Sequence, residues 1–352
     1  MIHFSGIQQL GVGVASTDEG FAWYRRAFGI DVPVFREAAE APLMTQYTGG
    51  EVHSRDAMLA INMAGGGGLE IWQFTSRTPI APSTPPSIGD YGIIAGLIKV
   101  RGITQAYQRL QSIGANVLSA PTAGPDGRER FAVTDPWGNT FVLVEFSEFF
   151  TKPRDAVGGV AGALLGVSDM DAALKFYRDV LGYDRVVSDE TAIHADLAGL
   201  PGGAKRKTHR VILERSTASS GPFSRLFGPT MLELVAWTGG KGKKIFADRY
   251  WGDLGFIHLC FDIVGMDELR ERFENAGYPF TIDSGGRFDM GEAGGRFSYV
   301  EDPDGTWIEF VETHKIPVAK KIGWYMDLSK RDPAKPLPNW MIKTMGMGRV
   351  KE

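Results

Sequence analysis

The pattern of apolar and polar residues near the start of the chain recurs in its second half. Residues Ile7–Ile30 and Val160–Tyr183 each contain an apolar strand, a Ser/Thr-Asp pair typical of helix N-caps, and a segment ending at glycine. Between cap and glycine, apolar residues recur every three or four positions, which predicts an amphipathic helix. The apolar stripes comprise Phe21, Tyr24 and Phe28 in the first copy and Leu174, Tyr177 and Leu181 in the second. We therefore expect a duplicated strand–helix opening.

Further periodic segments continue the pattern through the first half of the chain. The predicted elements are, in order, strands around 32–35, 57–63 and 69–74, a restart at Ile93, a helix near 105–112 and a strand over 142–146. The proline-rich stretch Pro79–Pro86 is expected to be a connector, because proline cannot donate a hydrogen bond to a sheet.

The second half repeats this order, restarting at Phe256 with a helix over 266–275 and a last strand over 307–311. Each half then holds two strand–helix–three-strand units, so the fold class is α+β with four βαβββ units in two modules. Proline and glycines in 152–159 suggest a boundary there. We expect a first module over 1–150, a second over 157–313 and a basic C-terminal tail over 314–352.

Composition narrows the class of protein. The 352 residues are 43% hydrophobic and 23% charged, as in globular domains, and a formal net charge of −4 argues against a nucleic-acid partner. The single cysteine excludes an internal disulfide framework and fits a reducing compartment. No apolar run reaches membrane-spanning length, and no signal peptide is recognisable. We expect a cytoplasmic protein without a membrane partner.

A second duplicated phrase carries a chemical difference between the halves. DPWGNTFVLVEF begins at Asp135 and DPDGTWIEFVE at Asp302, and each follows a strand opened by glycine, GIIAGLIKV or GFIHLCFDI. When the copies are superimposed, Ala95 matches His258 and Val142 matches Glu309. One copy therefore has an imidazole and a carboxylate where the other has two inert side chains.

Other polar residues interrupt apolar strands. Glu70 in LEIWQF and Glu233 in MLELVAW are expected to be buried, and a buried carboxylate needs a cation, of which a metal is one option. Gln9 shares a strand face with Gly11 and Gly13, which leaves space beside it. A lone strand histidine such as His258 is more often a satisfied core residue than a ligand, so the residues alone leave both interpretations open.

Together, DPDGTWIEF, GFIHL and VSDMDAALKFYRDVLG resemble the vicinal oxygen chelate superfamily, which includes glyoxalase I and the extradiol dioxygenases. The resemblance covers roughly Ile7 to Glu312. It implies that two βαβββ units curl into a cup around a divalent metal, with ligands from the first and fourth strands of each unit. The corresponding positions in the four units are Gln9 and Glu70, Ala95 and Val142, Gly162 and Glu233, and His258 and Glu309.

The pairing of the units decides the ligand set that this resemblance implies. If the first unit faces the fourth, one cup holds Gln9, Glu70, His258 and Glu309, and the other is nearly bare. If each cup forms within a module, the second module holds only Glu233 with His258 and Glu309. We favour the crossed pairing, because it sorts the ligands into one complete set.

The complete set resembles that of glyoxalase I and implies a metal-dependent lyase or isomerase. Such an enzyme stabilises an enediolate and moves a proton on an α-hydroxycarbonyl or thiohemiacetal substrate. By this resemblance Glu309 is the general base, Glu70 its counterpart across the metal, and no further cofactor is implied. One amide, one imidazole and two carboxylates suit zinc, nickel, cobalt or manganese better than iron.

Two other functions fit the same resemblance. An extradiol-type ring-cleaving dioxygenase normally uses two histidines and one carboxylate, and a non-catalytic small-molecule or antibiotic-binding protein would need no metal ligands. The connectors Ser76–Tyr91 and Gly239–Gly252 are longer than a compact glyoxalase requires and are candidate lids. We expect a small-molecule substrate and a monomer or homodimer.

Overall fold

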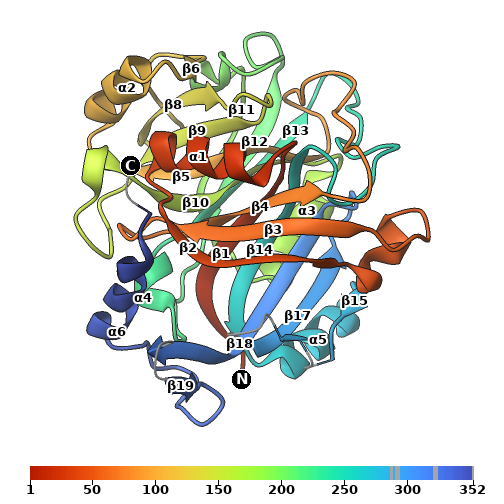
Figure 1. Ribbon diagram of the computed structural model, residues 1–352. Helices are drawn as coiled ribbons and strands as arrows, with labels where there is room; N and C mark the ends of the chain where they lie inside the picture. The colour runs from red at the N-terminus through yellow and green to blue at the C-terminus, as the bar shows by residue number, and fades with distance from the viewer. Residues whose placement is uncertain (286–287, 290–293, 320–323, 351–352) are drawn as a thin grey trace.

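The computed structural model describes residues 1–285, 288–289, 294–319 and 324–350. Over these residues the chain forms two curved mixed sheets with few helices (Figure 1). Four βαβββ units are present, which confirms the predicted fold class.

The first unit comprises β1 (His3–Gly13), α1 (Thr17–Phe28), β2 (Val32–Glu40), the short helix η1 (Pro42–Tyr47), β3 (Ser54–Ile61) and β4 (Gly68–Phe74). The second comprises β5 (Gly92–Val100), α2 (Ile103–Ser112), β6 (Asn116–Val117), β7 (Thr122–Ala123), β8 (Glu129–Thr134) and β9 (Thr140–Glu145).

The third comprises η2 (Arg154–Ala156), β10 (Val157–Gly166), α3 (Met170–Leu174), η3 (Lys175–Val180), β11 (Arg185–Ala192), η4 (Ala195–Leu197), β12 (Thr208–Glu214), α4 (Ser224–Phe227) and β13 (Met231–Trp237). The fourth comprises β14 (Gly255–Val264), α5 (Met266–Asn275), β15 (Ile282–Asp283), β16 (Phe288–Asp289), β17 (Gly294–Glu301) and β18 (Trp307–Ala319). After it come β19 (Trp324–Asp327), α6 (Asn339–Thr344) and η6 (Met345–Gly348).

The sheets combine units from opposite ends of the chain. In the first sheet the strand order is β15-β17-β18-β14-β1-β4-β3-β2, with β16 beside β17 and β19 beside β18. The second sheet has the order β11-β12-β13-β10-β5-β9-β8-β6, with β7 beside β8. Unit one is thus joined to unit four through the antiparallel pair β1–β14, and unit two to unit three through β5–β10 (Figure 1). The crossed pairing predicted from the sequence is confirmed.

The duplicated Asp-Pro phrases form turns that anchor the opening helices. The carboxylate of Asp135 accepts hydrogen bonds from the backbone of Trp137 and Asn139 and from the Tyr24 hydroxyl of α1, at 2.6 Å. The carboxylate of Asp302 likewise accepts hydrogen bonds from the backbone of Asp304 and Thr306. It also accepts one from the Tyr177 hydroxyl, at 2.7 Å. Burial, followed by the charge of Asp135, raises the pKa of Tyr24 well above its usual value. This structural role explains why both copies of the phrase retain the aspartate.

Helix ends follow the predicted signals. In α1 the Ser16 side chain accepts from the backbone of Glu19, and Gly29 ends the helix with φ +62°, a left-handed conformation that favours glycine. The buried face of α1 includes Tyr24, Ala27 and Phe28, which join one large apolar core that also contains residues of both sheets. The helix therefore packs against this core.

The concave faces of the two sheets hold different side chains. The first encloses an aromatic cluster with Trp72, Trp251, Tyr299 and Trp307 among its members. The second is filled mainly by aliphatic residues, Ala95 and Val142 included. None of the helices in the described residues is long and apolar enough to cross a membrane.

Candidate metal centre

Four polar side chains meet inside the first cup, and they come from four adjacent strands. Gln9 lies on β1, Glu70 on β4, His258 on β14 and Glu309 on β18. Ligand atoms of the last three lie within 4.8 Å of one another. The structure therefore brings together the four residues of the crossed pairing, whereas Glu233 of the alternative set lies in the second cup.

The contact distances fit donors arranged around one small cation. Gln9 Nε2 lies 3.1 Å from Glu70 Oε2 and 3.3 Å from Glu309 Oε2. His258 Nε2 lies 3.2 Å and 3.0 Å from the same two oxygens. Two ligands bound at right angles about 2.1 Å from one ion stand about 3.0 Å apart. The observed spacings match that value.

The amide of Gln9 also fits a metal ligand. Its Oε1 atom is buried and has no hydrogen-bond partner among the described residues. Rotation of the amide by 180° would exchange Oε1 with Nε2 and turn the oxygen toward the two carboxylates. A cation between them would then satisfy an acceptor that the protein itself leaves unpaired.

Two of the three register shifts in the β1–β14 pairing lie beside these side chains. The β1–β14 pairing shifts register between Ile7 and Gln9 and again between Leu10 and Val12. At the second shift, Gly11 stands opposite the His258 imidazole, and a Cβ atom on Gly11 would lie 2.5 Å from the ring. The glycine beside Gln9 therefore makes room for the histidine, as its position on the strand suggested.

Two aromatic residues that the sequence did not indicate surround His258. The Tyr299 hydroxyl lies 3.3 Å from Nδ1, which leaves Nε2 directed at the carboxylates. The Trp251 ring lies nearly parallel to the imidazole, with centroids 6.2 Å apart. Tyr299 stands directly opposite Glu309 in the β17–β18 register, but only the strand pairing reveals this. Trp251 belongs to a connector without any motif.

The site is almost closed to solvent. The His258 side chain is 1% exposed, and those of Glu309 and Glu70 are 9% and 12% exposed. Burial lowers the pKa of His258, but the neighbouring Glu309 and Glu70 raise it more, to about 10. The two carboxylates therefore favour the protonated form of the imidazole, and Nε2 lies 3.2 Å and 3.0 Å from their oxygens.

This raised pKa predicts that cation binding releases a proton. A protonated imidazole cannot bind a metal, so uptake of Zn²⁺ at pH 7 should release about one proton from His258. The apparent affinity should increase as the pH rises toward 10. Titration calorimetry in buffers of different ionisation enthalpy measures the number released. Equal proton release by wild type and by the His258→Ala variant would contradict the assignment.

Comparison with protein families gives an independent result. The model of the Glyoxalase/Bleomycin resistance protein/Dioxygenase superfamily matches residues 6–143 and 159–310. The chain belongs to this superfamily. No curated protein matched the sequence.

Solved structures with the same fold include members of the superfamily. Glyoxalase I from Zea mays shares 15% identity, with a TM-score of 0.54, over 87% of this chain and 92% of that one. A variant of the same enzyme gives 13% identity and a TM-score of 0.55, over 87% and 93%. A putative dioxygenase from Bacillus subtilis strain 168 gives 15% and 0.60, over 88% and 86%. At these identities the likeness establishes the fold alone.

The second cup of this superfamily member holds an ion-pair network. Ala95 and Val142 occupy two of the ligand positions, and at Gly162 a Cβ atom would lie only 1.8 Å from the Met231 carbonyl oxygen. The fourth position, Glu233, is 1% exposed and is bound by Arg130 and Arg210. Among the described residues this cup contains no group suited to a metal.

Arginines therefore supply the cation that Glu233 requires. Burial raises the pKa of Glu233, but Arg130 and Arg210 lower it more, below its ordinary value. Arg210 also donates two hydrogen bonds of 2.9 Å to Asp196, and Arg130 contacts Asp126. Glu233, which the sequence placed in the nearly bare second cup, therefore belongs to a charged cluster that cross-links β8, β12 and β13.

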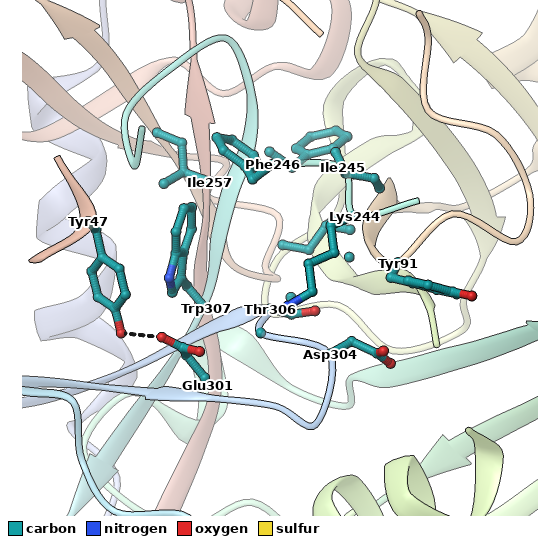
Figure 2. Close-up of a pocket in the computed structure, with 14 residues that line it drawn as sticks. Tyr47, Tyr91, Lys244, Ile245, Phe246, Ile257, Glu301, Asp304, Thr306 and Trp307 are labelled. Atoms are coloured by element: carbon teal, nitrogen blue, oxygen red, sulfur yellow. Dashed lines mark hydrogen bonds between the residues drawn. The ribbon is translucent and has the colours of Figure 1, made fainter. Parts of the chain in front are cut away.

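A pocket lies beside Trp307 of the first cup, and none of the four polar donors is among the residues that line it (Figure 2). Trp307 lines it and lies two residues before Glu309 on β18, so both side chains face the same side of the sheet. Tyr47 and Phe246 pack against Trp307, with ring centroids 5.2 Å and 5.1 Å away. Lys244, exposed to solvent, lines the opposite part of the pocket. The pocket thus has aromatic walls, one of which, Trp307, shares a face of β18 with Glu309.

Proposed function

We propose that this protein is a divalent-metal-dependent lyase or isomerase of the glyoxalase I type. The observation that carries the proposal is the convergence of Gln9, Glu70, His258 and Glu309 at spacings that suit one cation. Such an ion would polarise the oxygens of an α-hydroxycarbonyl or thiohemiacetal substrate and make the adjacent C–H bond more acidic.

The residues of the chain divide the remaining work. Glu309 would accept the proton from the substrate carbon. Glu70, which contacts His258 Nε2 as Glu309 does, would remain a negatively charged ligand of the cation. Tyr299 would hold the imidazole in place through Nδ1. The pocket beside Trp307 would accommodate the part of the substrate that does not react.

The donor set also favours this reaction over its alternatives. It contains one imidazole, whereas oxygen-activating iron sites of the facial-triad type use two histidines and one carboxylate. We propose zinc, nickel, cobalt or manganese in preference to iron. A binding protein without a metal would have no need to bury two carboxylates and an unpaired amide oxygen beside a histidine. All four donors come from one chain, so a monomer would suffice.

Elemental analysis of freshly purified protein tests this function directly. We expect about one equivalent of a divalent metal per chain in the wild type and in a His194→Ala control, and almost none in the His258→Ala variant. His194 is a suitable control because it is also buried but lies outside the first cup. Stoichiometric metal in His258→Ala would contradict the assignment of the centre. Its absence from all three proteins would favour a non-catalytic binding function.

A further inference from the structure

The connector between β13 and β14 places a tryptophan against the metal centre. Trp251 is 4% exposed, and its ring lies nearly parallel to the His258 imidazole. Trp72 is 3% exposed and lies two residues after Glu70 on β4, so it faces into the same cup. The two indole rings meet edge to face with centroids 4.3 Å apart. Both rings belong to the buried aromatic cluster of the first cup.

The indole N–H groups of both tryptophans lack an acceptor. The Nε1 atoms of Trp72 and Trp251 are fully buried, and neither has a hydrogen-bond partner among the described residues. Buried polar groups are nearly always paired in native proteins, because an unpaired one loses its hydrogen bonds to water without replacement. Two such donors in adjacent rings therefore require a specific explanation.

No acceptor of the described residues reaches either indole N–H group. The carboxylate of Glu70 is already contacted by Gln9 and His258, and the Tyr299 hydroxyl is engaged by His258. Beside Trp72, the connector contributes the backbone of Gly252, where a Cβ atom would lie 2.5 Å from Nε1. Gly252 has φ +96°, a conformation that glycine adopts readily. The connector thus approaches the Trp72 indole closely, and none of its described oxygen atoms accepts a hydrogen bond from Nε1.

We propose that the indole N–H groups of Trp72 and Trp251 bind oxygen atoms of the substrate. This inference rests on the proposed function and deepens it. The substrate class is an α-hydroxycarbonyl compound whose oxygens gain negative charge during proton removal. Neutral N–H donors in a site closed to water stabilise such charge without adding a competing cation. Trp251 would reach this position as part of the connector, whose backbone is tied to η1 by the 3.1 Å hydrogen bond from Trp251 N to the Tyr47 carbonyl.

The two donors can be observed individually by NMR. The chain has eight tryptophans, so a protein labelled with ¹⁵N should give few indole signals, and Trp72→Phe and Trp251→Phe assign two of them. The probe is acetohydroxamate, which presents two vicinal oxygens, added to the full-length protein loaded with Zn²⁺. We expect the Trp72 and Trp251 proton signals to move downfield, as hydrogen-bonded N–H protons do, and that of Trp23, which packs in the large core outside the cup, to stay in place.

Binding affinity gives a second measure. Each of Trp72→Phe and Trp251→Phe keeps most of the ring and removes the N–H, so each should weaken acetohydroxamate binding roughly three- to tenfold. The matched control Trp23→Phe should leave the affinity unchanged. Unaltered affinity in both cup variants, together with unmoved indole signals on the probe-bound protein, would overturn the inference.

The metal content of the same samples separates the two proposals. If the protein holds metal and binds the probe but the indole signals do not respond, the tryptophan assignment fails and the proposed function stands. If the protein takes up no metal, the proposed function fails, and acetate replaces the hydroxamate as probe. Shifts of both indole signals with acetate would then uphold an oxygen-binding pair, and unmoved signals would overturn it.

Discussion

Replacing Glu309 with glutamine should reduce turnover by roughly 10²- to 10⁴-fold. The amide keeps the size of the side chain and one oxygen that can bind a cation, but it cannot accept a proton at neutral pH. The fold should be retained, because Glu309 lies on β18 between β14 and β17 and the backbone pairing is unaffected. The measurement is the rate at which the protein exchanges the α-proton of an accepted α-hydroxycarbonyl compound with D₂O, at saturating Zn²⁺.

The control for this variant lies on the same strand. Glu312 accepts a hydrogen bond from the backbone of Gly265, so Glu312→Gln makes the same chemical change outside the cup. We expect its exchange rate to stay close to that of the wild type. A Glu309→Gln protein that binds metal and retains full activity would show that another group moves the proton.

Replacing Glu233 with alanine should destabilise the protein by about 3–5 kcal/mol. The change leaves Arg130 and Arg210 buried with Asp126 and Asp196 as their remaining counter-ions, and both guanidinium groups are 0% exposed. Loss of one partner from a buried network costs far more than loss of a surface pair, because the other charge stays out of water. The measurement is the free energy of unfolding from urea denaturation.

Asp179→Ala provides the comparison for that experiment. Asp179 pairs with Arg178 at 2.7 Å, but both side chains are exposed, so its removal should cost no more than about 1 kcal/mol. If Glu233→Ala also costs less than this, the network in the second cup contributes little to stability. The metal content of Glu233→Ala should equal that of the wild type, since the two cups share no donor.

The fold and the polar quartet of the site were predictable because they depend on local patterns. Glycine-opened strands, capped helices and Asp-Pro turns recur at matching positions in both halves, and β-strand periodicity places Glu70 and Glu309 on definite faces. The crossed pairing followed from chemistry, since only that pairing places four donors in one cup. It required knowledge of which residue types bind metals, which the resemblance supplied.

The remaining parts depend on contacts between segments distant in the sequence. The need of Glu233 for a cation was foreseeable, but Arg130 and Arg210 reach it from β8 and β12, and nothing in those strands distinguishes them from surface arginines. Trp251 lies in a connector, where periodicity gives no direction for a side chain. The β-bulges on β1 and β14 shift side chains between faces, and a single residue inserted into a strand leaves no clear mark in sequence.

The pairing of β1 with β14 also determines when the centre can form during synthesis. Gln9 and Glu309 are in contact although 300 residues separate them in the chain. When only the first half of the chain has been synthesised, Gln9 and Glu70 have no partners. The edge of β1 that β14 will later cover is then exposed. The first sheet cannot be completed before the last strands are made, so the candidate metal centre is among the final parts of the molecule to assemble.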